Sequence, residues 1–319
     1  MRLPILAGLA MALILSGCQN GSTIAPPGPP PPLHGPQAWA ITTGGSSQSD
    51  AMQAFDYYPN AMTIDVGDTI TFTDQVPEPH TVSIPPAGAT PPPGPPQPPV
   101  GGTTFDGTAY ISSGFLAPNQ NYTVTFTKAG TYKVYCLIHQ PEMTGTIVVQ
   151  PAGTSYPKDQ SQYFAESSAD LTLDLGDASN SVATFPYAIG GLHLAAGIAP
   201  GLAAGAPAQS TVMRFLNATT LGSQPLNATV PLGGTITWTN QSNNAPHTIS
   251  FPIAGQGPPA GPPDAPPFGL PTYDGTAYVS SGPINPGGSF SLTFTHVGTY
   301  TYYCLFHFPE GMMGTVTVV

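Results

Sequence analysis

Charged side chains are scarce in this 319-residue chain, and basic side chains are the scarcest. Charged residues make up 7% of the sequence, with five Lys and Arg against sixteen Asp and Glu and a net charge of -11. Binding to nucleic acid needs clustered Lys and Arg that neutralise phosphates. The composition therefore argues against nucleic acid as a partner. The 41 prolines and 37 glycines predict loops and spacers rather than long helices.

No apolar run is long enough to cross a bilayer comfortably as a mature helix. The longest, Leu3 to Leu15, follows Arg2 and ends in LSGC, which resembles the lipobox of bacterial lipoproteins. The resemblance implies a signal peptide at 1–18 and a lipid on Cys18. The alternative is an ordinary secretory signal that contains a cysteine. We expect an exported chain, anchored by lipid to the cell membrane on its periplasmic or extracellular face, with a proline-rich spacer at 19–36.

One ten-residue segment occurs twice, as FDGTAYISSG at 105–114 and YDGTAYVSSG at 273–282. The offset of 168 positions is also the offset between Cys136 and Cys304, which indicates a duplicated domain. In both copies, short runs rich in Thr, Val and aromatic residues alternate with period two and are broken by Gly and Pro. Such runs are typical of half-buried strands. The sequence therefore predicts an all-β fold of two sandwiches.

The predicted boundaries follow from the repeat. The first domain covers 37–150, the second covers 186–319, and a linker at 151–185 contains a candidate short helix at 158–175. The Gly/Ala-rich segment 190–208 either packs on the second domain or is mobile. Each domain also has a proline-rich insertion, at 85–100 and 252–271, interpreted as a solvated polyproline loop or as a surface for docking a partner.

Each copy also carries a set of sulfur and imidazole ligands. The segments YCLIHQPEM at 135–143 and YCLFHFPEGM at 303–312 each offer a thiolate, an imidazole and a thioether. A second imidazole comes from an upstream Pro-His, at His80 and at His247. A thiolate, two imidazoles and a weak thioether form the ligand set of a mononuclear copper electron-transfer site. A disulfide between the two cysteines is the alternative, but it does not explain why each has the same place in its own repeat.

Both halves resemble plastocyanin-type cupredoxins, the blue copper proteins, over about 51–149 and 211–319. The second half matches through NNAPH at 243–247 and through Cys-x2-His-x4-Met followed by Gly314. The resemblance implies Greek-key β-sandwiches and two type 1 copper sites. The implied ligands are His80, Cys136, His139 and Met143 in the first site, and His247, Cys304, His307 and Met312 in the second.

The two sites differ in loop length. The first loop is one residue shorter because Gly311 has no counterpart, which we expect to alter the axial bond and to separate the two redox potentials. Alignment on Gly145 and Gly314 favours Met312 over Met313 as the axial ligand. The histidines at 34, 193 and 296 lack this context, and we expect surface or structural roles for them.

Two-domain cupredoxins also include nitrite reductases and small multicopper oxidases, whose additional copper is bound by His-x-His pairs or by a histidine directly before the cysteine. Here Tyr135 and Tyr303 precede the cysteines, and no His-x-His occurs. We therefore expect an electron carrier and not an enzyme, serving redox partners such as cytochromes, other copper proteins or oxidases. The resemblance implies that His139 and His307 lie nearest to solvent, within apolar patches.

Several alternatives stay open at this point. The two sites work either in series or as parallel carriers. A copper store or delivery protein would use similar ligands. The enzymatic alternative is an oxidase or nitrite reductase that lacks its type 2 site. An adhesive sandwich would leave the ligands without a role. Without an intersubunit copper, we expect a monomer.

Overall fold

The computed structural model describes residues 34–92, 98–184, 193–198, 210–216, 226–242, 245–258, 265–269 and 271–319. The predicted signal peptide, Cys18 and most of the predicted spacer lie outside the described residues. Within the described part of the chain, no helix combines the length and the apolar character needed to cross a membrane.

Among the described residues, each half contributes ten strands in the same order, so that β1 to β10 correspond to β11 to β20. The strands of the first half are β1 (Ala38–Ser46), β2 (Met52–Tyr58), β3 (Ala61–Asp65), β4 (Thr69–Asp74), β5 (His80–Ile84), β6 (Thr104–Phe105), β7 (Ile111–Leu116), β8 (Asn121–Phe126), β9 (Gly130–Tyr135) and β10 (Thr144–Gln150). Those of the second half are β11 (His193–Ile198), β12 (Ser210–Leu216), β13 (Leu226–Val230), β14 (Thr235–Gln241), β15 (Ser250–Phe251), β16 (Thr272–Tyr273), β17 (Val279–Ser280), β18 (Ser289–Phe294), β19 (Gly298–Tyr303) and β20 (Met313–Val318).

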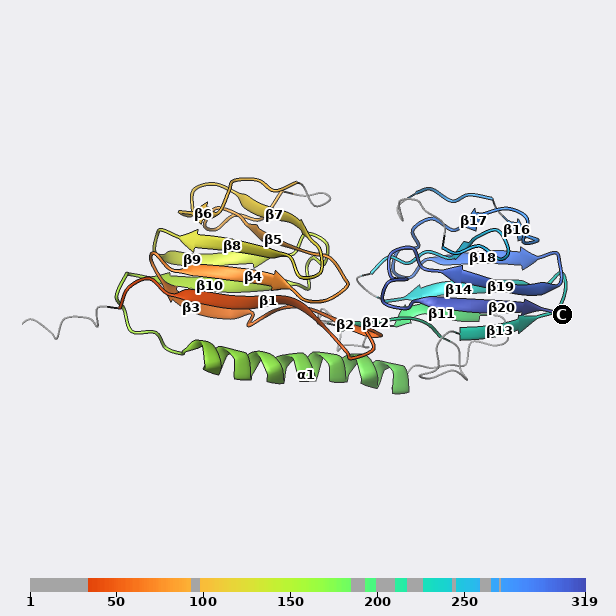
Figure 1. Cartoon of the computed structure of the whole chain (residues 1–319), viewed down its shortest axis with the longest axis horizontal. Coiled ribbons are helices and arrows are strands. Elements are labelled where there is room, and N and C mark those ends of the chain that lie inside the picture. Colours follow the sequence, from red (N-terminus) through yellow and green to blue (C-terminus); the bar gives the residue numbers. More distant parts are fainter. Residues whose placement is uncertain are drawn as a thin grey trace, which may run out of the picture.

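The strands form two β-sandwiches that lie side by side (Figure 1). In the first, β6-β8-β4-β1-β2 faces β3-β10-β9-β5-β7; in the second, β16-β18-β14-β11-β12 faces β13-β20-β19-β15-β17. The alternation seen in the sequence matches the burial: in β4, Ile70 and Phe72 are fully buried, as are Ile236 and Trp238 in β14. In such strands alternate residues fill the core between the two sheets, whereas β5 and β12 are buried along their whole length. The prediction of an all-β tandem fold is confirmed.

The two sandwiches share one sheet. Strand β2 pairs antiparallel with β12, with Ala54 opposite Ser210 and Met52 opposite Val212, so that a ten-stranded sheet runs through both halves. Because β2 and β12 are equivalent strands, their antiparallel pairing relates the halves by an approximate twofold rotation. Two residues of the second half, Met213 and Ala245, are buried in the core of the first. The halves therefore form one packed unit.

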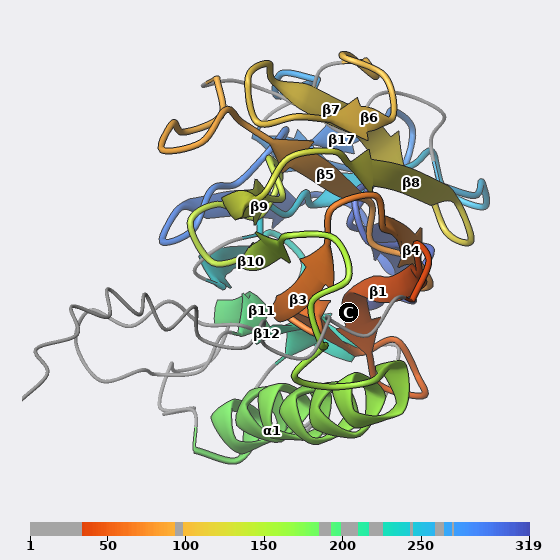
Figure 2. The ribbon, with the colours of Figure 1, turned by 90° about the vertical axis from the view of Figure 1, so that its left-hand side faces the viewer.

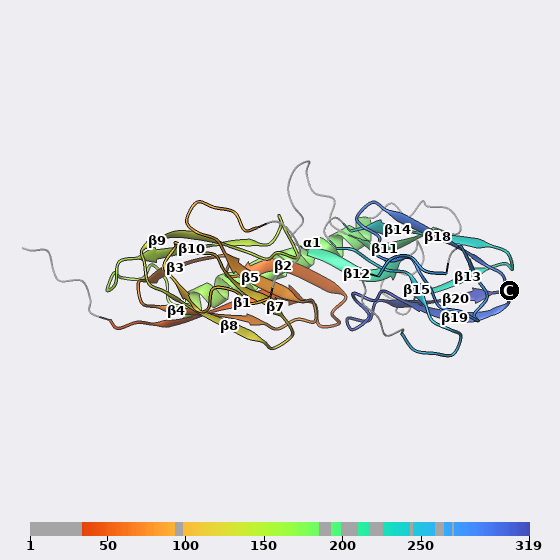
Figure 3. The same cartoon turned by 90° about the horizontal axis from the view of Figure 1, so that it is seen from above.

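The linker holds a single long helix, α1 (Gln160–Thr184). The predicted helix at 158–175 is right in position but too short, and the expectation from composition that long helices are absent is wrong here. The segment contains no proline, and Asp159 caps its start by accepting a hydrogen bond from the Gln162 N–H at 2.9 Å. Figure 2 shows α1 below the first sandwich, and Figure 3 shows it extending from there toward β11 and β12.

The Gly/Ala-rich segment after α1 contains β11, which pairs with β12 and β14. Where it is described, this segment therefore packs on the second sandwich, as one of the two alternatives predicted.

Candidate metal centre

All eight predicted ligands are buried near strand ends. Cys136 follows β9 and Cys304 follows β19, and each is closed into a loop by a 3.1 Å hydrogen bond from its N–H to the carbonyl of Met143 or Met312. The exposed fraction is 0% for the two cysteines, the two methionines, His80 and His247, and 2% for His139 and His307. The short loops between β9 and β10 and between β19 and β20 therefore turn their sulfur and nitrogen atoms inward.

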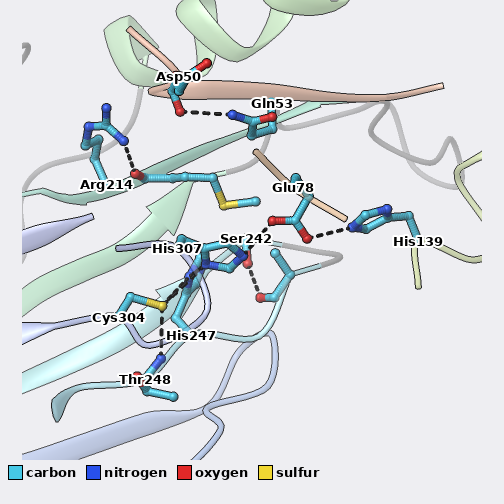
Figure 4. Close-up of polar contacts among 12 residues, drawn as sticks. Asp50, Gln53, Glu78, His139, Arg214, Ser242, His247, Thr248, Cys304 and His307 are labelled. Carbon is cyan, nitrogen blue, oxygen red and sulfur yellow. Dashed lines mark hydrogen bonds and ion pairs between the residues drawn. The ribbon is translucent and has the colours of Figure 1, made fainter. Parts of the chain in front are cut away.

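In the second half, three donor atoms converge (Figure 4). Cys304 Sγ lies 3.4 Å from His307 Nδ1 and 3.7 Å from His247 Nδ1, and the two nitrogens are 3.0 Å apart. Metal bonds of about 2.0–2.3 Å to nitrogen and sulfur put donors around one ion at similar separations. A thiolate with two imidazoles, shielded from water, is a donor set that suits copper. The residues of this site therefore fit the metal that the sequence predicts.

Protonation in the second site also favours a metal ligand. Burial and the adjacent His307 hold the pKa of His247 well below its usual range, so that this imidazole is neutral. Burial opposes the charge on His307, but Cys304 and Glu78 outweigh it and raise the pKa of His307 well above its usual value. A bound metal ion would replace the proton on Nδ1 of His307, the nitrogen that faces Cys304 Sγ. Met312 is fully buried and Met313 is partly exposed, which favours Met312 as the axial sulfur.

The first site is assembled only in part. Cys136 Sγ lies 3.5 Å from His139 Nδ1, but Nδ1 of His80 lies 3.3 Å from Oδ2 of buried Asp74. Among the described residues, the grouping of three donors within 4.8 Å of one another occurs in the second site alone. The residue equivalent to Asp74 is Asn240, which instead donates to backbone carbonyls. His80 has to turn from Asp74 to join the other two donors.

The two assembled donors of the first site influence each other. Burial alone would raise the pKa of Cys136, but the nearby His139 outweighs it and lowers the pKa to about 6. Burial likewise opposes the charge on His139, but Cys136 and Glu78 raise its pKa to about 9. The pair therefore favours the thiolate, which is the form that binds metal.

Glu78 lies between the two sites (Figure 4). Its Oε1 accepts a hydrogen bond from His139 Nε2 at 3.2 Å, and its Oε2 is 3.3 Å from His307 Nε2. Burial would raise the pKa of this carboxyl, but His307 and His139 outweigh it and hold the pKa well below its usual range. Of the eight predicted ligands, His139 and His307 are the most exposed, at 2% against 0% for the others, as expected, although the junction of the halves encloses both rings.

An apolar cleft of about 590 Å³ lies beside this junction. Residues of both halves line it, including Leu137, Ile138, Leu305 and Phe306, and Phe115, which is 58% exposed, stands at its side. The cleft reaches the edges of both histidine rings and Glu78. It is therefore a shared route from the surface to the two sites.

Sequence reasoning missed Asp74 and Glu78. The available signal was a carboxylate six and two residues before His80, in a chain with few charges. The remaining histidines behave as expected where they are described: His34 contacts the Thr154 carbonyl at 3.0 Å, and His296 Nδ1 is 2.7 Å from the Val297 carbonyl. The cysteines at 136 and 304 are free, so the alternative of a disulfide between them is excluded.

Comparisons with known proteins find one copper-binding family for both halves. The model of the copper-binding proteins of the plastocyanin/azurin family matches residues 45–150 and 212–319, one match in each sandwich. Chloroplastic plastocyanin of Oryza sativa subsp. indica is 35% identical over 137 residues, which cover 43% of this chain and 79% of the relative. Amicyanin of Paracoccus denitrificans is 29% identical over 119 residues, covering 37% of this chain and 76% of the relative. A solved structure of an amicyanin variant in the reduced state is 25% identical, with a TM-score of 0.25, and the match covers 35% of this chain and 82% of that one.

Proposed function

Because the chain belongs to the plastocyanin/azurin family of copper-binding proteins, we propose that it is an electron carrier with two type 1 copper sites on one membrane-anchored chain. Copper in these sites supplies one-electron exchange between Cu(I) and Cu(II). The observation that carries the proposal is the convergence of Cys304, His247 and His307 in a buried pocket. The chain is not an enzyme, since tyrosine precedes each cysteine where the related enzymes have histidine.

The residues of the second site fix the donors before metal arrives. His247, Cys304 and His307 supply the strong ligands, and Met312 the weak axial sulfur. The Thr248 N–H lies 3.4 Å from Cys304 Sγ, where it stabilises negative charge on the sulfur. A buried set of ligands that already lie together changes little between oxidation states, which favours fast electron exchange.

The first site uses His80, Cys136, His139 and Met143 and is unequal to the second. Its loop is shorter, and Asp74 competes for His80. Both differences support two distinct redox potentials.

Electrons would enter through the shared apolar cleft. The partners are other redox proteins, such as cytochromes, copper proteins or oxidases, that can place an apolar surface over it. The lipid on Cys18 would hold the exported chain at the membrane, and we expect it to act as a monomer.

Metal content and the visible spectrum of the purified full chain test the proposal. We expect about two coppers per chain and an intense blue absorption that disappears on reduction. Cys136→Ser and Cys304→Ser should each remove one copper and part of the absorption. If both single variants keep the full absorption, the proposal fails.

The membrane anchor has its own test. Cys18→Ser should move the chain from the membrane fraction to the soluble fraction and leave the copper spectrum unchanged. A Cys18→Ser chain that stays in the membrane fraction contradicts the lipid anchor but not the copper sites.

A copper store or delivery protein is the second candidate, because Asp74 leaves the first site incomplete. It predicts that a chelator removes copper readily from both sites and that neither site shows reversible redox chemistry.

A further inference from the structure

The twofold-like junction brings the same part of both sites together. His139 and His307 are equivalent residues, and each directs Nδ1 toward its cysteine and Nε2 toward Glu78. One carboxylate, that of Glu78, receives both Nε2 edges at 3.2 and 3.3 Å. The twofold relation fails here, since the residue equivalent to Glu78 is Ala245. A single acid therefore serves two sites.

We propose that Glu78 is a shared positioning residue that joins the two sites into one unit, so that they exchange electrons inside the chain and act in series. This inference rests on the proposed function. One electron passes from one site to the other: the donor site changes from Cu(I) to Cu(II) and the acceptor site from Cu(II) to Cu(I). No proton moves and no bond breaks in the step.

The contacts with the two histidines give Glu78 two effects. A carboxylate that accepts the second N–H of a ligating histidine fixes the ring and makes it a stronger ligand. Here the two rings are fixed by the two oxygens of one group, so the arrangement of one site constrains the other. The buried negative charge also favours the oxidised form of both sites, because that form carries one more positive charge.

The burial of the three side chains excludes a simple surface role. Glu78 is 6% exposed, both histidines are 2% exposed, and the three lie where the halves meet. An outside partner therefore meets the two ring edges and Glu78 through one cleft, and the shortest polar connection between the sites runs through protein.

The first experiment measures electron exchange in the copper-loaded full chain. A photoreduced flavin delivers less than one electron per chain. Electron paramagnetic resonance of freeze-quenched samples then follows the Cu(II) signal of each site and shows which site has been reduced. The Cys136→Ser and Cys304→Ser chains provide the reference spectra of the single sites. We expect exchange between the sites at a rate that does not depend on protein concentration. Glu78→Gln should slow it about tenfold or more, and Glu166→Gln, on the exposed face of α1, should leave it unchanged. Exchange that rises in proportion to protein concentration in the unaltered chain overturns the proposal, whether or not the variant folds.

The second experiment separates positioning from a merely structural role. In the metal-free chain and in the Cu(I) form, the Nε2–H signals of His139 and His307 in nitrogen-15 spectra should move together in Glu78→Gln. Potentiometric titration should show both sites becoming easier to reduce, by about tenfold in the Cu(I)/Cu(II) ratio, or 59 mV for a one-electron couple. A shift at one histidine and one potential alone means that Glu78 serves a single site and overturns the proposal.

These results also separate the inference from the proposed function. A chain that binds no copper, or that shows no blue absorption, refutes the proposed function. A chain with two blue copper sites and no internal exchange refutes only the role of Glu78.

Discussion

Asp74 and Asn240 occupy equivalent positions but treat the upstream ligand differently. Asp74 contacts the ring of His80, whereas the side-chain amide of Asn240 donates hydrogen bonds to backbone carbonyls. His247 is therefore free to face Cys304. We predict that Asp74→Asn tightens copper binding at the first site about tenfold, the lower end of effects seen for such supporting groups. Competition with a chelator, followed at each site by its absorption, measures this.

The matched control for Asp74 lies in the second site. Asn240→Asp should weaken copper binding there, because it creates the competing carboxylate and removes two amide hydrogen bonds. If Asp74→Asn instead weakens copper binding at the first site, then Asp74 orients His80 as a ligand and does not keep it away from the metal.

The ligand set itself was predictable from sequence, because Cys, His and Met occur at loop spacing in one short segment. The roles of Asp74 and Glu78 were not. Glu78 contacts His139 and His307, which are far from it in the chain, and the contact with His307 depends on how the halves meet. Local spacing carries no information on such a junction.

Asp56 makes stability depend on pH. Burial, with help from nearby Asp174 and Asp170, raises the pKa of Asp56 to about 7, although hydrogen bonds from Asn60 and Tyr57 oppose the shift. A carboxyl whose pKa is raised on folding stabilises the fold fully below its unfolded pKa of about 3.9 and loses this contribution as pH rises through 7. We predict that the free energy of unfolding falls between pH 4 and pH 8, by up to about 4 kcal/mol from this group.

Urea unfolding of the metal-free chain at pH 5 and pH 8 checks the role of Asp56. Asp56→Asn keeps an oxygen for the Tyr57 N–H and should flatten the pH dependence and raise the stability at pH 8. An equal pH dependence in both chains would assign the effect to other groups.

At the scale of elements, the strands were easier to predict than the helix. Strands such as β4 and β14 show clear alternation, and their polar and apolar residues have the predicted burial. Helix α1 continues past residue 175 because Ala178 still packs between the halves, next to Val212 and Leu216 of β12. That contact depends on β12 lying beside β2, so the sequence of the helix alone did not predict its end.

Tyr163 tests how firmly α1 holds the first sandwich. Its ring is 2% exposed within the core, and its hydroxyl accepts a 2.9 Å hydrogen bond from the Thr63 N–H of β3. We predict that Tyr163→Ala lowers the free energy of unfolding by about 3–5 kcal/mol, since it leaves a cavity and an unpaired N–H. The neighbouring Phe164, which is 47% exposed, is the control, and Phe164→Ala should cost about 0.5 kcal/mol or less. Equal losses for the two would mean that the helix docks weakly.

At the scale of the whole molecule, the sequence predicted two sandwiches joined by a linker, and the structure instead has one sheet through both. The pairing involves Met52, Ala54, Ser210 and Val212, which carry no feature that sets them apart from other strand residues. Edge strands pair through backbone groups, so such a contact leaves little trace in side-chain patterns. The consequence is physical: unfolding one half exposes the edge strand and part of the core of the other.

We therefore predict that the metal-free chain unfolds in one cooperative transition, and the chain provides its own reporters. It has two tryptophans, buried Trp39 in the first half and buried Trp238 in the second. Trp238→Phe and Trp39→Phe chains thus report one half each by fluorescence in urea, and their transitions should coincide.

Met213 supplies the decisive variant, because it belongs to β12 of the second half and is fully buried in the core of the first. Met213→Ala should lower the free energy of unfolding by about 2–5 kcal/mol and shift both tryptophan reporters by the same amount. The control is Leu232→Ala, since Leu232 is 56% exposed and its loss should shift neither reporter by more than about 0.5 kcal/mol. Two separate transitions, with Met213→Ala moving only one of them, would mean that the halves fold independently. In that case the contact between Glu78 and His307, which joins the two halves, would be lost as soon as either sandwich unfolds, and the sites would be joined only while the junction is closed.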